Sequence, residues 1–169
     1  FKQLAVDQVS EYVADLALRD YVHGLVSAHS PELRKAALGV ELDIAPDCQV
    51  RLAAGKLSQI LSNLLMNSAR HGYPQGGPGR ITIRARIEMA DADAAASWLL
   101  LEFSDDGIGL APAVREHMFE PFFTTKRGQG GSGLGMHIVY TIVQQLGGEV
   151  SAVDSSPGCH IHIRLPLAG

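Results

Sequence analysis

The chain has 169 residues, 46% of them hydrophobic, which is typical of one compact domain with a substantial core. The formal net charge is −4 and the 14 Lys and Arg residues are scattered, which argues against a nucleic-acid groove. No apolar stretch approaches the roughly 20 residues that cross a bilayer. Cys48 and Cys159 form neither a disulfide framework nor a metal-binding pattern. A cytoplasmic domain is therefore expected.

The first part of the chain favours helices. Apolar residues at helical spacing in Phe1 to Asp15 predict the end of an upstream helix or a linker, followed by one domain over residues 16–169. Leu16 to Leu38 also favours a helix. Because Ser30-Pro31-Glu32 has the N-cap, proline and acid that begin a new helix, a kink or break is expected there.

Two short strands are expected next. Val40, Leu42 and Ile44 alternate with acidic residues, as in a half-buried strand. Pro46-Asp47 predicts a turn into a second strand over residues 49–52, so the two strands are expected to form a hairpin.

The middle of the chain contains the clearest helix. Apolar residues recur every three or four positions from Lys56 to His71, and Gly72 ends the pattern. Alternation over residues 81–87 predicts a strand, and the apolar run Trp98 to Phe103 predicts a central strand.

The last third begins with a glycine-rich run over residues 128–135 that opens onto an amphipathic helix, Met136 to Leu146. Strands are expected over residues 149–153 and 159–165. Strands interrupted by helices predict an α/β fold: a two-layer sandwich with a mixed, mainly antiparallel sheet covered on one face by about three helices.

Two polar side chains stand out on the central helix. Asn63 and Asn67 are four residues apart and so lie on one helix face. An amide oxygen is a neutral hard ligand suited to Mg²⁺. For an isolated pair a solvated helix face is the alternative, but the flanking Leu and Met residues place this pair beside a buried stripe.

A carboxylate follows the predicted central strand. Asp106 precedes Gly107 and Gly109, so its carboxylate is presented at a strand end with little bulk beside it. Asp105 is the competing acceptor, and an Asp-Gly turn is the structural alternative.

The glycine-rich run has five glycines in eight residues and leaves backbone amides unobstructed before a helix N-terminus, which suits a triphosphate. It is not a P-loop, because no Gly-Lys-Ser/Thr follows. Lys126 and Arg127, just before it, supply positive charge.

Four segments, in this order and at these separations, resemble the N, G1, F and G2 boxes of the histidine-kinase catalytic domain, in the superfamily of gyrase, Hsp90 and MutL. They are Asn63 to Asn67, Asp106 to Gly109, Phe119 to Lys126 and Gly131 to Gly135. The resemblance covers roughly Leu16 to Pro166.

The resemblance implies an ATP site with Asn67 as the Mg²⁺ ligand and Asp106, by its spacing to the glycines, as the acceptor for the adenine amine. Arg70 and His71 fall where the family often places phosphate contacts. The residues expected to bind ATP are Asn63, Asn67, Arg70, His71, Asp106, Gly107, Gly109, Thr125, Lys126, Gly131, Ser132, Gly133, Leu134 and Gly135.

The resemblance also implies a reaction. Hydrolytic members of the superfamily have a water-activating Glu one helical turn before the metal-binding Asn, where this chain has Asn63. An amide cannot act as a general base. The γ-phosphate is therefore expected to go to a histidine on a separate dimerisation domain and then to a response-regulator aspartate. The full-length protein is expected to be a homodimer, compatible with anchoring in the inner membrane.

The histidines of this chain do not fit the acceptor role. Pro31 interrupts the acceptor-like sequence that begins at His29, so His29 is interpreted as structural. His160 and His162 face one side of a strand without evident carboxylate or cysteine partners.

The alternative function is a nucleotide-binding regulatory module that transfers no phosphate. Departures from the family pattern keep it open: Met136 and His137 stand where Leu and Ala are common, and Cys159 replaces the usual Thr. None of them removes a predicted phosphate or Mg²⁺ contact.

Overall fold

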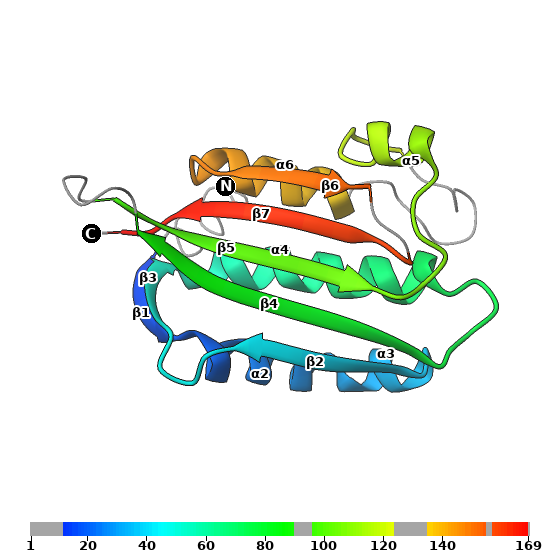
Figure 1. Cartoon of the computed structure of the whole chain (residues 1–169), viewed down its shortest axis with the longest axis horizontal. Coiled ribbons are helices and arrows are strands. Elements are labelled where there is room, and N and C mark those ends of the chain that lie inside the picture. The colour runs from blue at the N-terminus through cyan, green and yellow to red at the C-terminus, as the bar shows by residue number, and fades with distance from the viewer. Residues whose placement is uncertain (1–11, 90–95, 124–134, 155–156, 169) are drawn as a thin grey trace, which may run out of the picture.

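The computed structural model describes residues 12–89, 96–123, 135–154 and 157–168. A five-stranded sheet forms one layer, and helices cover one of its faces (Figure 1). In spatial order the strands are β2 (Leu38–Ile44), β4 (Gly79–Met89), β5 (Ser97–Asp105), β7 (His160–Pro166) and β6 (Glu149–Val153). Only the β2–β4 pair is parallel. The predicted mixed two-layer sandwich, with its central strand at β5, is confirmed.

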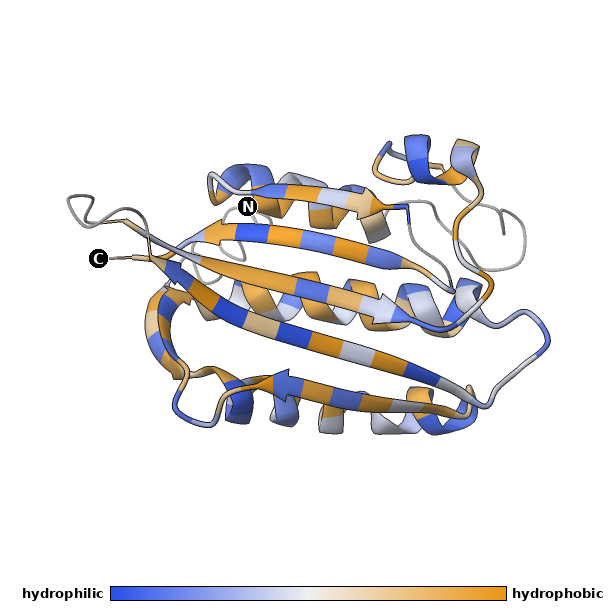
Figure 2. Cartoon of the chain, in the orientation of Figure 1, coloured by the Kyte–Doolittle hydropathy of each residue, from blue (hydrophilic) through white to orange (hydrophobic). Residues whose placement is uncertain are grey.

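Alternating side chains separate the two faces of the sheet. On β4, Ile81, Ile83 and Ala85 are buried under the helices, whereas Arg84 is exposed on the opposite face. The same alternation of apolar and polar positions runs along the neighbouring strands (Figure 2). The open face is held by polar pairs instead, such as Arg84 with Asp43 at 2.7 Å.

Helices lie behind the sheet in Figure 1, and a short helix lies beyond the sheet end. Those behind the sheet are α2 (Leu18–Ala28), α3 (Ser30–Lys35), α4 (Ala54–Asn67) and α6 (Gly135–Gln145), and the short helix is α5 (Pro112–His117). The predicted helix over 56–71 is confirmed as α4 followed by a π-helical turn, η1 (Ser68–Gly72). The apolar side of α4 fills the centre of the core with Leu57, Ile60, Leu61, Leu64 and Leu65.

The break predicted near Ser30 is confirmed, since α2 ends at Ala28 and α3 begins at Ser30. His29 lies at this junction, and its Nε2 is 2.9 Å from Ser62 Oγ on α4. The imidazole is therefore tied into the fold of the domain.

The predicted hairpin over residues 40–52 is wrong. β3 (Gln49–Ala53) pairs antiparallel with β1 (Val13–Ala17) in a separate two-stranded sheet, while β2 pairs with β4. The alternation that predicts each strand does not name its partner, and here both partners are distant in sequence.

The helix predicted from Phe1 to Asp15 is wrong for Val13 to Asp15, which lie in β1. The predicted boundary after Asp15 thus falls inside a strand that is paired with the domain. The earlier part of that helix lies outside the described residues.

One tight contact ties the end of β5 to the start of β7. Gly158 has a φ of +83°, and a Cβ there would collide with the carbonyl oxygen of Asp105. Only glycine combines this backbone conformation with this close approach.

We therefore expect Gly158→Ala to lower the free energy of unfolding by at least about 2 kcal/mol, because it adds both backbone strain and a clash. Urea denaturation measures the change. Gly24→Ala is the matched control: nothing lies within 4 Å of a Cβ at this helical glycine. That variant should gain roughly 0.5 to 1 kcal/mol. Equal stability of the Gly158 variant and the parent would contradict the packing argument.

Candidate functional site

Three element ends meet at one end of the sandwich. β5 ends, α4 passes into η1, and α6 begins there, at the right-hand end of Figure 1. The approach is close, because a Cβ at Gly135, the first residue of α6, would lie 3.4 Å from Asn63 Oδ1 on α4. Of the candidate residues in the last third of the sequence, Gly135 is thus placed beside Asn63.

Asn63 and Asn67 are both half-buried on α4, as expected from their spacing. Asn63 Nδ2 donates a hydrogen bond to the carbonyl oxygen of Gln59 at 2.8 Å, which leaves its Oδ1 toward α6. In the part of the chain that the structure describes, the Asn67 side chain makes no hydrogen bond. Its amide oxygen is therefore available to a ligand.

The basic candidates lie just beyond these amides. Arg70 is exposed and His71 is half-buried, both in the π-helical turn that follows Asn67. Single-turn π insertions in helices occur frequently at functional sites. The candidates Thr125, Lys126, Gly131, Ser132, Gly133 and Leu134 lie outside the described residues.

A buried carboxylate forms the floor of the site. Asp105 is only 5% exposed. Its Oδ1 accepts hydrogen bonds from the backbone N–H groups of Gly107 at 3.0 Å and Cys159 at 3.1 Å. Its Oδ2 accepts one from Ser68 Oγ at 2.6 Å. A buried charge is tolerated only with such partners.

Gly72 leaves Oδ2 of Asp105 approachable from one side. A Cβ at Gly72 would lie 3.3 Å from this oxygen, so the absence of a side chain there leaves space beside it. Since Ser68 occupies one direction of Oδ2, the oxygen retains capacity for one further donor. An exocyclic amine of a base is such a donor.

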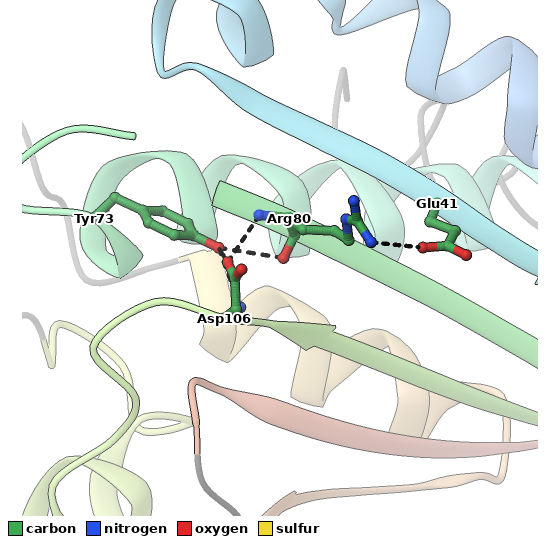
Figure 3. A network of polar contacts seen from close by, with 4 residues as sticks. All are labelled: Glu41, Tyr73, Arg80 and Asp106. Carbon is green, nitrogen blue, oxygen red and sulfur yellow. Dashed lines mark hydrogen bonds and ion pairs between the residues drawn. The ribbon is translucent and has the colours of Figure 1, made fainter. Parts of the chain in front are cut away.

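Asp106 is placed differently. Its carboxylate is exposed, and its Oδ1 accepts hydrogen bonds from Tyr73 Oη at 2.6 Å and from the N–H of Arg80 at 2.8 Å (Figure 3). Both hydrogen bonds hold the pKa of Asp106 below its ordinary value, and the one from the Arg80 N–H has the larger effect. Arg80 in turn reaches Glu41 at 3.5 Å.

The geometry does not support the choice of Asp106 over Asp105 as the base acceptor. Asp106 is exposed and already accepts hydrogen bonds from Tyr73 and Arg80, whereas Asp105 is buried beside Gly72. The signal was present in the sequence: buried positions on β5 are Leu99, Leu101 and Phe103, and Asp105 is next in that alternation.

Gly107 and Gly109 serve backbone packing. A Cβ at Gly107 would collide with the carbonyl oxygen of Gly72, which accepts a hydrogen bond from Ile108 N at 2.9 Å. Gly109 has a φ of +79° and lies against the backbone of Gly158. Both glycines therefore allow the turn after β5 to pack closely against its neighbours. They were expected instead to make room for the base.

Ser68 and Cys159 lie beside Asp105 and were not among the residues expected to bind ATP. Ser68 supplies the hydroxyl to Asp105, and its position one turn after the buried Leu64 indicates that it faces inward. Cys159, where the family usually has Thr, is buried beside Asp105. Burial, followed by the charge of Asp105, raises the pKa of the Cys159 thiol to about 12, so it stays protonated at neutral pH.

The comparisons with known proteins identify the family of this chain. Residues 53–169 match the family described as "Histidine kinase-, DNA gyrase B-, and HSP90-like ATPase". The chain is 39% identical over 138 residues to the two-component sensor PprA of Pseudomonas aeruginosa, covering 80% of this chain and 14% of PprA. It is 41% identical over 118 residues to the sensor kinase CckA of Brucella abortus, covering 64% of this chain and 12% of CckA.

Solved structures share the fold. The catalytic domain of histidine kinase ThkA superposes with a TM-score of 0.75 at 22% identity, covering 92% of this chain and 95% of that domain. Full-length ShkA in complex with AMPPNP gives a TM-score of 0.75 at 22% identity, covering 94% of this chain and 32% of ShkA. The chain thus spans a small part of the length of its curated relatives and about a third of ShkA. It belongs to the histidine kinase-, DNA gyrase B- and HSP90-like ATPase family and is an ATP-binding catalytic domain like those of two-component sensor histidine kinases.

Proposed function

We propose that this domain binds Mg²⁺·ATP and donates the γ-phosphate to a histidine on a separate dimerisation domain, from which it passes to an aspartate of a response regulator. The observation that carries the proposal is the buried Asp105, opened toward a ligand at Gly72, at the point where α4 ends and α6 begins. PprA, CckA and ShkA are full-length proteins with further regions, and the partner domains are inferred from them.

Recognition of the base is assigned to Asp105. Its Oδ2 is fixed by Ser68 and has room beside Gly72 for the exocyclic amine of adenine. Because the pocket floor is buried, a charge-assisted hydrogen bond there is stronger than one in water. Guanine presents a carbonyl oxygen at the same position, which the carboxylate would repel.

The phosphates are assigned to the part of the site formed by the start of α6 and the end of α4. The N-terminal end of α6 carries the positive end of the helix dipole and begins at Gly135, beside Asn63. Arg70 and His71 follow Asn67 on η1, at the same end of α4. We include Lys126 and the glycines of residues 131–135 in the phosphate site on the strength of the family resemblance.

Asn67 is proposed as the Mg²⁺ ligand. Its half-buried amide offers an oxygen of the hard, neutral kind that this ion accepts, and Mg²⁺ fills its remaining positions with water and phosphate oxygens. Bound there, the ion would neutralise charge on the phosphates.

Transfer rather than hydrolysis follows from the chemistry of Asn63. Its side chain is an amide already donating to Gln59, and it cannot remove a proton from water. The chain's own residues therefore bind and orient the nucleotide, which is most of what phosphoryl transfer requires.

Among the described residues, none of the helices has the length and apolar character needed to span a membrane. A cytoplasmic location is proposed because the domain needs ATP.

We expect Asp105→Asn to weaken ADP binding about tenfold to a hundredfold, because one charge-assisted hydrogen bond to the base is lost. Titration calorimetry measures the affinity. Asp15→Asn is the matched control, since Asp15 forms an exposed ion pair with Arg51 on the small sheet, which holds no candidate site residue. Unchanged affinity of the Asp105 variant, with the fold intact by circular dichroism, would remove Asp105 from the base site.

Asn67→Ala should abolish most of the gain in ATP affinity that Mg²⁺ gives the parent domain, since the proposed protein ligand is removed. The measurement is ATP affinity with and without Mg²⁺. Gln59→Ala removes another amide from the same helix at an exposed position and should keep the full metal effect. An equal Mg²⁺ effect in both variants would show that the metal is held elsewhere.

The purified domain should not phosphorylate itself, because its His29 is fixed between α2 and α3 against Ser62. Labelled ATP is added to the domain alone and together with a separately expressed dimerisation domain from a related kinase. Label on the added domain alone is expected. If label instead appears on this chain and disappears in His29→Ala, the assignment is overturned, and nucleotide binding without any transfer would favour the regulatory alternative.

A further inference from the structure

We infer that Tyr73 is a positioning residue for adenine recognition: through Asp106 it holds Gly72 and the turn after β5 in the arrangement that opens Asp105 to the base. This inference rests on the proposed role of Asp105 and adds to it the residue that maintains its geometry. The hydrogen bonds of the Tyr73 hydroxyl go to Asp106 and Arg80 and not to Asp105, so its effect would be transmitted through the backbone.

Tyr73 joins three segments that are distant in sequence. It follows η1 directly, its hydroxyl bonds to Asp106 at the end of β5, and Asp106 bonds to Arg80 at the start of β4 (Figure 3). The hydroxyl is 3.3 Å from the Arg80 carbonyl oxygen and 2.6 Å from Asp106 Oδ1. Its single proton is therefore given to Asp106.

The contact works in both directions. The backbone N–H of Asp106 lies 3.2 Å from the Tyr73 hydroxyl oxygen and 3.2 Å from the Arg80 carbonyl oxygen. Asp106 thus meets Tyr73 with both its backbone and its carboxylate. We call Tyr73, Arg80 and Asp106 the clamp.

The ring of Tyr73 is also fixed. A Cβ at Gly79 would collide with the ring, so the ring lies directly on the backbone where β4 begins. Burial, then the bond to Asp106, raises the pKa of the Tyr73 hydroxyl, while the pKa of Asp106 is lowered. At neutral pH the Tyr73 hydroxyl therefore stays the donor and the Asp106 carboxylate the acceptor.

The clamp reaches Asp105 through Gly72. Gly72 is the residue before Tyr73. Its carbonyl oxygen accepts a hydrogen bond from the N–H of Ile108 at 2.9 Å, and Gly107 packs against the same carbonyl. Gly72 also borders the open side of Asp105 Oδ2. Any shift of Tyr73 away from Asp106 moves Gly72 and therefore changes the space in which the base amine must fit.

The same turn carries the hydroxyl that holds Asp105. Ser68 and Gly72 are the two ends of η1, and both lie at Oδ2 of Asp105. The five-residue π turn is thus anchored at its beginning by the carboxylate and just after its end by the clamp. Without the second anchor, η1 would be tied to Oδ2 of Asp105 by Ser68 alone.

The test compares Tyr73→Phe, which removes the hydroxyl and keeps the ring on Gly79, with Tyr21→Phe. Tyr21 is the matched control because its hydroxyl also ties two segments, donating to the Ala54 carbonyl oxygen at 2.7 Å at the opposite end of α4. Titration calorimetry with ADP and with GDP gives affinity and the fraction of binding-competent protein for each variant of the whole chain.

For Tyr73→Phe we expect ADP affinity about threefold to tenfold weaker. The reason is that a shift of Gly72 weakens the charge-assisted hydrogen bond between the base amine and Asp105. The affinity for GDP should change less, so discrimination between the bases falls. A purely structural effect would lower the competent fraction and the melting temperature while leaving both affinities unchanged, as expected for Tyr21→Phe.

Asp106 provides a second, independent reading. Asp106→Asn keeps an oxygen that can accept from Tyr73 and Arg80, whereas Asp106→Ala removes it. The Asn variant should keep more ADP selectivity than the Ala variant, and Tyr73→Phe should add little to Asp106→Ala because both remove the same contact.

The outcomes separate the two claims. If Asp105→Asn weakens ADP binding while Tyr73→Phe behaves like Tyr21→Phe, the clamp is overturned and the assignment of Asp105 stands. If Asp105→Asn leaves the selectivity for ADP unchanged, the base site and the clamp both fall. Reduced selectivity in Asp105→Asn, Tyr73→Phe and Asp106→Ala together supports both.

Discussion

A charge placed at the buried end of a central strand is the constraint on which the site depends. Asp105 continues the buried positions of β5, and the other three, Leu99, Leu101 and Phe103, are apolar. A carboxylate in that position is stable only if the fold supplies donors, and it does so from three places: a side chain on η1, the turn that follows β5, and the backbone that opens β7. The elements around the site are therefore held in mutual register by one side chain.

The glycines around this carboxylate follow from the same constraint. For the backbone amides of Gly107 and Cys159 to reach one oxygen, the surrounding chains must approach until no Cβ fits between them, as at Gly107 and Gly158. Residues that the sequence analysis associated with ligand approach are thus required first by packing.

Local patterns in the sequence predicted the elements well and their partners poorly. The three-and-four spacing of α4 and the alternation of β4 and β5 reflect burial of one face, which each segment shows by itself. Pairing of β3 with β1 is a long-range choice that alternation leaves open. The short α5 has no buried residue and hence no periodic signal. The alternation of β5 indicates that Asp105 is buried, whereas the motif spacing favours Asp106 as the base acceptor, and we propose Asp105.

The parallel pairing of β2 with β4 has a consequence for the order in which the domain can assemble. Parallel neighbours need a crossover, and here the crossover contains α4 and η1, so the helix with both asparagines is also the connection that closes the sheet edge. During synthesis Ser68 emerges well before Asp105, and the amide of Cys159 emerges last. A nascent chain can therefore contain every residue of the central helix and still have no completed floor for a nucleotide until its final strand has joined.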